Sequence, residues 1–214
     1  MSKSSRAEHK NKPEIEAIIF DIGRVIVDLD PSRAIAAIGA ASTLAPDKLW
    51  HSVQKDPLWN GWQEGRVTPR EWYENLIARF HTPVSFDEFR NAWNSVLVPR
   101  LLLPEHLFKQ LSKKFRLVLL SNTDPIHVAY MEANFKFVRY FPKRIYSCDV
   151  GASKPSAKIF RAAIDAAGLP SERILYIDDI RQYVLAARRI GLNALQFHSR
   201  RRLEADLRAR RLLG

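Results

Sequence analysis

One short segment of the chain reads Ala17-Ile18-Ile19-Phe20-Asp21-Ile22-Gly23. Its apolar residues predict a buried strand, and its carboxylate follows where that strand ends. Open α/β sheets bind their ligands at the carboxyl ends of the strands, and a glycine lets the backbone approach a ligand closely. We therefore expect Asp21 to lie in an active site.

Strand and helix patterns alternate in the second half of the chain. Apolar runs predict strands at residues 116–120, 144–147, 174–177 and 194–197, and the stretches around them predict helices at 104–114, 125–135, 157–167 and 183–190. This alternation is typical of a parallel sheet with helices on both faces. We predict an α/β fold with a Rossmann-like core.

Residues 32–98 carry helical signals, and no strand pattern interrupts them. The segments Thr68-Pro69-Arg70-Glu71 and Ser85-Phe86-Asp87-Glu88 both match the capping box that begins a helix. We therefore predict an all-helical cap domain inserted into the core domain, and a turn-rich loop that leads into it. The expected boundaries are 28–31 for the loop, 32–99 for the cap, and 15–31 with 100–214 for the core.

The composition is that of a globular protein without a membrane span. Of the 214 residues, 46% are hydrophobic, and no apolar run approaches the roughly 18 residues that a span needs. Residues 1–14 form a polar leader that we expect to be disordered, with no export signal. The single cysteine, Cys148, follows apolar residues, so we expect a packed thiol in a reducing cytoplasm.

The net charge of +11 is concentrated toward the C-terminus. Between residues 188 and 211 there are eight arginines against Glu204 and Asp206. Leu203 and Leu207 share one helical face, which favours a closing helix with its leucines on the core and its arginines in water. A surface for phosphate-bearing polymers is the competing interpretation. No aromatic residues alternate with these arginines to stack on bases, so we do not expect a nucleic-acid partner.

Polar side chains recur at four places where predicted strands end or helices begin. In chain order they are Asp21, then Ser121 with Asn122, then Lys154, and last the adjacent pair Asp178 and Asp179. Parallel strands bring their carboxyl ends to one edge of a sheet, so we expect the first, second and fourth places to converge. Each place taken singly is also typical of an ordinary turn or helix cap.

Such a set of side chains suits the transfer of a phosphoryl group. Clustered carboxylates repel one another unless a cation lies between them, and their hard oxygen ligands suit magnesium. Ser121 and Lys154 could bind phosphate oxygens while Asp21 attacks phosphorus in line. The sequence therefore predicts a small phosphorylated substrate and Mg²⁺ as the cofactor.

The four places also resemble the four motifs of the haloacid dehalogenase-like hydrolases, in the branch with a helical cap after the first motif. The matching segments are Phe20–Asp28, Leu120–Thr123, Ser153–Pro155 and Ile177–Asp179, and the likeness extends from Ile15 to about His198. Within that family, the Asp-x-Gly first motif and the segment Trp62–Thr68 are similar to bacterial phosphatases of the glucose-1-phosphate phosphatase type.

The resemblance implies a role for each residue of the motifs. Asp21 is the expected nucleophile, which becomes an aspartyl-phosphate. Magnesium is expected on Asp21, the Gly23 carbonyl, Asp178 and Asp179, and phosphate on Ser121, Asn122, Lys154 and the amides of Ile22 and Gly23. In the cap, Trp59, Trp62 and Glu64 are expected to face the leaving group. For both tryptophans, packing inside the cap is the favoured interpretation.

Three residues depart from the family pattern. Gly23 stands where most phosphatases of the family carry a second aspartate, the general acid and base, which usually contributes about 10²–10⁴-fold to the rate. Arg24 stands where a small or amide residue is usual, so it could bind an extra substrate anion or obstruct the site. Tyr183 replaces a polar residue that supports the metal site.

Three functions remain open at this point. The favoured one is a magnesium-dependent phosphatase that acts on a small phosphorylated metabolite, such as a sugar phosphate. The second is a 2-haloacid dehalogenase, in which Asp21 attacks carbon, although the paired Asp178 and Asp179 argue against a metal-free mechanism. The third is a slow or non-catalytic protein that binds anions or a partner.

Overall fold

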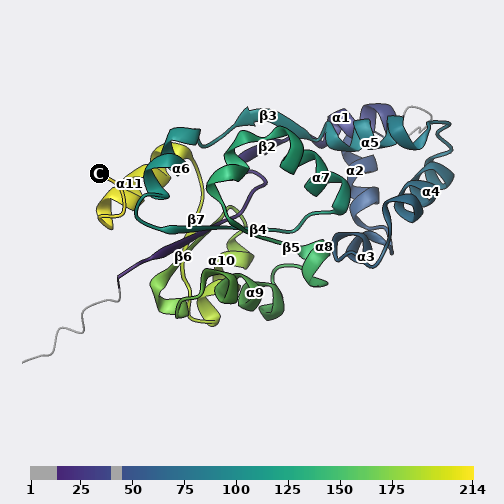
Figure 1. Cartoon of the computed structure of the whole chain (residues 1–214). Coiled ribbons are helices and arrows are strands. Elements are labelled where there is room, and N and C mark those ends of the chain that lie inside the picture. The colour runs from purple at the N-terminus through teal and green to yellow at the C-terminus, as the bar shows by residue number, and fades with distance from the viewer. Residues whose placement is uncertain (1–13, 40–44) are drawn as a thin grey trace, which may run out of the picture.

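Five parallel strands form the central sheet of this protein. The structure is a computed structural model that describes residues 14–39 and 45–214. The strands are β1 (Ala17–Phe20), β4 (Arg116–Ser121), β5 (Lys143–Tyr146), β6 (Ile174–Asp178) and β7 (Asn193–Gln196), in the spatial order β5-β4-β1-β6-β7 (Figure 1). All four pairings are parallel. The predicted α/β, Rossmann-like core is therefore confirmed, while residues 1–13 of the expected leader lie outside the described residues.

Helices cover both faces of this sheet (Figure 1). One face carries α6 (Glu105–Leu111), α7 (Pro125–Asn134), η1 (Lys136–Tyr140) and α11 (Arg200–Ala209), and the other carries α9 (Ala157–Ala167) and α10 (Arg181–Arg189). The short elements α8 (Ser147–Val150) and η2 (Ser171–Arg173) lie in the connections. Within β1, Ile18 and Phe20 join the first apolar cluster and Ala17 and Ile19 the second, because alternate strand residues point to opposite faces.

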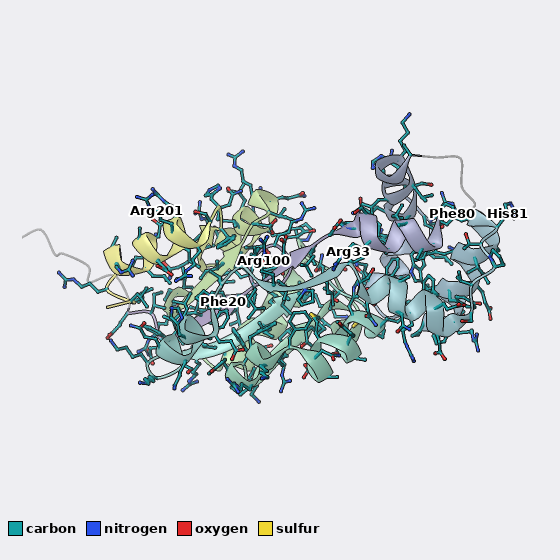
Figure 2. All side chains as sticks on the ribbon, turned by 90° about the horizontal axis from the view of Figure 1, so that it is seen from above. Phe20, Arg33, Phe80, His81, Arg100 and Arg201 are labelled. Atoms are coloured by element: carbon teal, nitrogen blue, oxygen red, sulfur yellow. The ribbon has the colours of Figure 1, made fainter. Side chains whose placement is uncertain are left out.

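The C-terminal helix α11 docks as its pattern predicts. Leu203 and Leu207 are buried, and the exposed Arg201 points outward (Figure 2). Several of its arginines pair with acids one turn away, as Arg200 does with Glu204. Figure 1 places α11 at the opposite end of the molecule from α4. Across the described ranges, none of the helices combines the length and the apolar character required to span a membrane.

Helices α1 to α5 gather at the other end of the molecule (Figure 1). They are α1 (Pro31–Ile38), α2 (Pro46–Gln54), α3 (Trp59–Gln63), α4 (Pro69–Phe80) and α5 (Phe86–Asn94). Both predicted capping boxes are formed, by Thr68 with Glu71 and by Ser85 with Glu88. These helices bury their own apolar cluster, which includes Trp62, Trp72 and Trp93. A separate core of this kind supports the proposed cap at 32–99, and helices α1 to α5 are called the cap from here on.

Among the strands, the sequence analysis missed a two-stranded antiparallel ribbon. It pairs β2 (Val27–Leu29) with β3 (Leu97–Leu101), where a loop and an uninterrupted helical region were expected. Pro99 hides β3, because proline cannot donate to a ladder and argues against a central strand. A two-stranded ribbon has only edge strands, so it tolerates that proline. The ribbon brings together the two ends of the helical insert.

A buried carboxylate in the cap gives a test of this packing. Asp56 accepts hydrogen bonds from Leu58 N at 2.9 Å and Asn75 Nδ2 at 3.0 Å and pairs with Arg79. Burial alone would raise the pKa of Asp56, but the hydrogen bonds from Asn75, Leu58 and Arg79 together lower it. The ionised Asp56 carboxylate therefore stabilises the fold at neutral pH, and this stabilisation is lost as pH falls through the lowered pKa.

Replacement of Asp56 by alanine should lower the free energy of unfolding by about 2–3 kcal/mol at neutral pH, because it leaves buried donors unpaired. Urea denaturation measures the change. The matched control is Asp87→Ala, whose side chain is 75% exposed, and it should change stability by less than about 0.5 kcal/mol. Equal effects of the two substitutions would contradict the role of Asp56.

Candidate active site

The carboxyl ends of three neighbouring strands form the floor of the candidate site. Asp21 follows β1, Ser121 ends β4 and Asp178 ends β6. The parallel register aligns Phe20 with Leu119 and Ile177, so these polar side chains emerge at the same edge of the sheet. The backbone N–H of Asp21 donates to Ile177 O at 2.9 Å, which extends the ladder by one residue and fixes the start of the loop.

Lys154 lies in the centre of this floor and is 3% exposed. Its Nζ donates to Asp21 Oδ1 and to Asp178 Oδ2, each at 2.8 Å, and to the carbonyl of Leu120 at 3.3 Å. Burial alone would lower the pKa of Lys154, but the two carboxylates raise it overall. The ammonium therefore stays charged and connects β1, β4 and β6.

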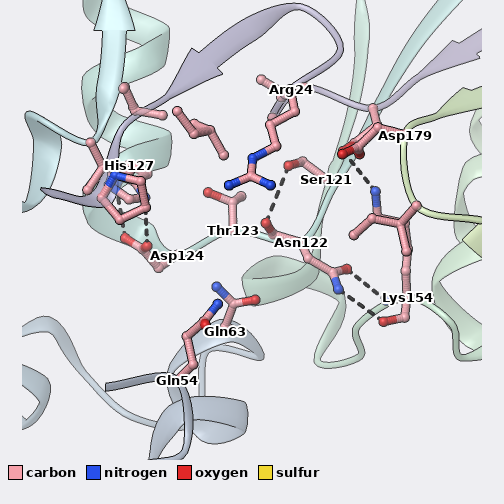
Figure 3. Close-up of a pocket in the computed structure, with 18 of the residues that line it drawn as sticks. Arg24, Gln54, Gln63, Ser121, Asn122, Thr123, Asp124, His127, Lys154 and Asp179 are labelled. Atoms are coloured by element: carbon pink, nitrogen blue, oxygen red, sulfur yellow. Dashed lines mark hydrogen bonds and ion pairs between the residues drawn. The ribbon is translucent and has the colours of Figure 1, made fainter. Parts of the chain in front are cut away.

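Asn122 holds the loop that carries Lys154. Its Oδ1 accepts from Lys154 N at 2.7 Å, and its Nδ2 donates to Lys154 O at 3.0 Å (Figure 3). Nδ2 also lies 3.5 Å from the hydroxyl of Tyr183, whose ring centroid is 5.2 Å from the Lys154 ammonium. The carboxamide of Asn122 thus positions Lys154, and its expected contact with phosphate stays a prediction.

Asp21, Asp178 and Asp179 form a cluster that fits a magnesium ion. Each offers a carboxylate oxygen, and the three atoms lie within 4.8 Å of one another. Three negative charges against the single positive charge of Lys154 leave a formal charge of −2, which one divalent cation cancels. Asp178 already accepts from Lys154, Tyr176 and the Ile180 amide, whereas the half-buried Asp179 carboxylate has no side-chain donor among the described residues. Asp179 is therefore the more available ligand.

The environment of Asp21 also favours a cation. Burial raises the pKa of Asp21 to about 7, against the opposing charge of Lys154, and Asp178 adds to the rise. Lys154 engages only Oδ1, and no other described side chain donates to Oδ2. A divalent ion beside this carboxylate favours its anionic form, which is the form that can act as a nucleophile.

A cavity of about 370 Å³ opens above these groups, between the sheet edge and helices α1 to α5. This volume falls within the range of small-molecule sites. Residues from both parts of the chain line it: Asp21, Gly23, Arg24, Ser121, Asn122, Lys154, Asp179, Trp50, Gln54, Trp59, Gln63, Thr123, Asp124, His127 and Tyr183 among them. Figure 3 shows Gln54 and Gln63 below Arg24, across the cavity from the strand ends.

Two of the expected cap residues do not face this cavity. Trp62 is fully buried and stacks on Trp72, with ring centroids 5.8 Å apart, so it is part of the cap core. Glu64 pairs with Arg66 and accepts from Ser153 N at 3.1 Å, which ties the cap to the loop before Lys154. The expectation that Glu64 faces the leaving group was wrong. Trp62 packs inside the cap, which was the favoured interpretation for the tryptophans, whereas Trp59 does line the cavity.

The sequence analysis missed a polar pair in the cavity wall, Asp124 and His127. Asp124 Oδ2 accepts from Trp93 Nε1 at 3.0 Å and lies 2.9 Å from His127 Nδ1, while His127 Nε2 lies 2.9 Å from Trp93 O. Asp124 Oδ1 also caps α7 through the His127 amide. Asp124 and His127 are three residues apart directly after the Leu120–Thr123 segment, and this spacing in the sequence could have identified the pair. The pair joins α7 to α5 of the cap.

Gly23 has a neighbour that fills the space where its side chain would be. A Cβ at this position would lie 2.8 Å from Leu29 Cδ1, at the start of the cap connection. The second aspartate of the family pattern could therefore stand here only if Leu29 moved. Cys148 is half-buried, and burial with the nearby Asp149 raises the pKa of its thiol to about 12, as expected for a packed thiol.

The chain is similar to known proteins of one hydrolase family. A model of the family described as haloacid dehalogenase-like hydrolase matches residues 15–191. A D-ribitol-5-phosphate phosphatase of Bacteroides thetaiotaomicron is 25% identical over 189 residues, which cover 85% of this chain and 91% of that protein.

Solved structures show the same likeness. An HAD family enzyme of B. thetaiotaomicron, in complex with magnesium and inorganic phosphate, has a TM-score of 0.74 and 26% identity, over 87% of this chain and 96% of that one. An HAD-like family hydrolase of Porphyromonas gingivalis has a TM-score of 0.74 and 24% identity, over 91% of this chain and 97% of that one, and shows the fold alone.

Replacement of Lys154 by methionine should lower the free energy of unfolding by about 3–5 kcal/mol in a chelating buffer, because it leaves two buried carboxylates without their cation. Chemical denaturation measures this loss, and the double variant Lys154→Met/Asp178→Asn should recover part of it. Lys158→Met, at an exposed lysine, is the control. A loss that Asp178→Asn does not reduce would contradict the electrostatic cause.

The imidazole of His127 should titrate above the ordinary value of about 6.5. Burial alone would lower the pKa of His127, but the Asp124 carboxylate and the Trp93 carbonyl raise it overall. Its contribution to stability is therefore complete at low pH and is lost as pH rises through the raised pKa. NMR titration of the ring measures the midpoint, which Asp124→Asn should lower; a wild-type midpoint below 6.5 would contradict the pairing.

Proposed function

Because the chain belongs to the haloacid dehalogenase-like hydrolases, we propose that it is a magnesium-dependent phosphatase of a small phosphorylated metabolite, such as a sugar phosphate. One observation carries the proposal: Lys154 holds Asp21 at the floor of a cavity, within 4.8 Å of the carboxylates of Asp178 and Asp179. The phosphatase activity named for the B. thetaiotaomicron relative and the magnesium and phosphate in a similar structure support it.

Magnesium would be held by Asp21 and Asp179, with Asp178 and the Gly23 carbonyl completing the protein ligands. When bound, it supplies positive charge that offsets the repulsion between an anionic nucleophile and an anionic substrate. The cluster of oxygen ligands and its formal charge of −2 fit such an ion. These assignments extend the motif roles of the family to this chain.

Asp21 is the proposed nucleophile. Lys154 orients its carboxylate through Oδ1, which directs Oδ2 toward a phosphorus atom for in-line attack and an aspartyl-phosphate intermediate. The Lys154 ammonium, the Ser121 hydroxyl and the amides of Ile22 and Gly23 would bind the phosphate oxygens. Water then cleaves the acyl phosphate and restores the carboxylate.

The cap side of the cavity would bind the leaving group. Trp50 and Trp59 supply apolar ring surface, and Gln54 and Gln63 supply amide donors and acceptors. This mixture suits a molecule with carbon–hydrogen faces and several hydroxyl groups, such as a sugar or a polyol. The contact between Glu64 and Ser153 N holds the cap near the strand ends and helps to exclude water.

The purified protein should release inorganic phosphate from some member of a panel of sugar, polyol, nucleoside and acyl phosphates when Mg²⁺ is present, and not in EDTA. Asp21→Asn should reduce kcat by at least about 10³-fold with the fold intact, because the amide is a poor nucleophile. Asp87→Asn, at a side chain that is 75% exposed and outside the cavity, should retain activity.

Full activity of Asp21→Asn would contradict the assignment of the nucleophile. Halide release from 2-haloacids without phosphate release would indicate a dehalogenase instead. Acid quenching during turnover, followed by peptide mass spectrometry, should find phosphate on the peptide that contains Asp21.

A further inference from the structure

Arg24 has an unusual backbone conformation for its residue type. Its φ of 56° lies in the left-handed region, which costs a non-glycine residue roughly 1 kcal/mol. The Arg24 amide donates to Val27 O at 2.7 Å, which closes the turn after β1. The turn directs the side chain into the cavity (Figure 3). Residues held in such conformations cluster at functional sites.

The Arg24 guanidinium has no hydrogen-bond or ion-pair partner within residues 14–39 and 45–214. The other cations of the cavity wall are engaged, because Lys154 pairs with Asp21 and His127 with Asp124. A guanidinium stays charged and presents a planar set of donors that matches phosphate oxygens. Arg24 is therefore available to an anion that enters the cavity.

Arg24 lies nearer to the end of the cavity where the strands finish than to the end lined by Trp50 and Trp59. Figure 3 shows the guanidinium beside Ser121 and Thr123, which lie at and just beyond the end of β4. Arg24 and Asp179, the proposed metal ligand, line the same cavity. An anion held by Ser121 and Lys154 would lie within reach of Arg24.

Neither Gly23 nor the pair of Asp124 and His127 offers a general acid at this end of the cavity. Gly23 has no side chain, and Leu29 occupies the space beside it. Asp124 accepts from the His127 amide, the His127 ring and Trp93 Nε1, and both ring nitrogens of His127 are engaged. Asp124 and His127 line the cavity, but their hydrogen bonds already connect α7 to Trp93 of the cap. The charge that develops on a leaving oxygen therefore needs another source of stabilisation.

We propose that Arg24 is a catalytic residue that binds the leaving oxygen of the scissile P–O bond and stabilises its negative charge. This inference rests on the proposed phosphatase function. The Asp21 carboxylate forms the new bond to phosphorus, the bond from phosphorus to the leaving oxygen breaks, and its electron pair moves to that oxygen beside the guanidinium. The guanidinium keeps its protons, and the alkoxide takes a proton from water, which leaves hydroxide.

The second half of the reaction restores the balance of protons. Water attacks the aspartyl-phosphate and releases the Asp21 carboxylate and dihydrogen phosphate, whose proton neutralises the hydroxide. The sum is one phosphate monoester and one water converted to one alcohol and hydrogen phosphate. Arg24 acts only through charge, so its effect must grow as the leaving oxygen becomes more basic.

A leaving-group series tests this dependence. Arg24→Gln should reduce kcat/KM by on the order of 10²–10³-fold for an alkyl phosphate such as D-ribitol 5-phosphate, the magnitude of a lost oxyanion donor. The loss should be less than about 10-fold for acetyl phosphate or p-nitrophenyl phosphate, whose leaving groups carry their own charge well. Arg100→Gln, at an exposed arginine paired with Asp28, should leave all three substrates unaffected.

A second variant separates catalysis from folding. Arg24→Gly removes the same guanidinium but suits the left-handed backbone, so it should show the same substrate-dependent loss with an equal or higher thermal midpoint. An equal loss for all three substrates would place Arg24 on the transferred phosphoryl group and overturn the proposal. A loss confined to substrates with an additional carboxylate or phosphate, or a gain of activity, would also overturn it.

The same measurements distinguish a failure of the proposed phosphatase function from a failure of the role of Arg24. If the wild-type protein releases no phosphate from any substrate with Mg²⁺, the proposed function itself fails. If the wild-type protein is active and Asp21→Asn is not, while Arg24→Gln shows no dependence on the leaving group, only the role of Arg24 fails.

Discussion

The ammonium of Lys154 lies between the carboxylates of Asp21 and Asp178, at 2.8 Å from each. An unpaired charge of either sign in this buried place would be costly, so the three groups depend on one another. The parallel register of β1, β4 and β6 and the two hydrogen bonds between the Asn122 carboxamide and the Lys154 backbone satisfy that requirement. The pairing of Lys154 with two buried carboxylates therefore both stabilises this edge of the sheet and orients Asp21, the proposed nucleophile.

Apart from Lys154 and the two carboxylates that it binds, the charged groups around the cavity divide into two sets. Asp124 and His127 bind each other and Trp93, and so join α7 to the cap. Asp179 and Arg24 retain their capacity for a ligand, one for a cation and the other for an anion. Because Asp124 and His127 bind each other and Trp93, they can hold the cap without binding substrate. Asp179 and Arg24 face the space in which the reaction is proposed.

The core of the fold was predictable because its signals are local. The apolar run before Asp21, the alternating strands and helices and the two capping boxes each occupy a few consecutive residues. The facing of Glu64 was not predictable, because it depends on where the loop before Lys154 lies. Gln54 and Gln63 carry no sequence pattern, and Pro99 masked β3. The convergence of Asp21, Ser121 and Asp179 followed from topology, whereas the engagement of Asn122 with the Lys154 backbone required coordinates.

All five tryptophans of the chain, at positions 50, 59, 62, 72 and 93, fall within helices α2 to α5. Their rings form a connected group, in which Trp93 also stacks on the His127 ring of α7. Intrinsic indole emission therefore originates wholly from the cap, while the five-stranded sheet is spectroscopically silent at those wavelengths. The protein carries its own optical reporter, one that monitors the cover of the cavity separately from its floor.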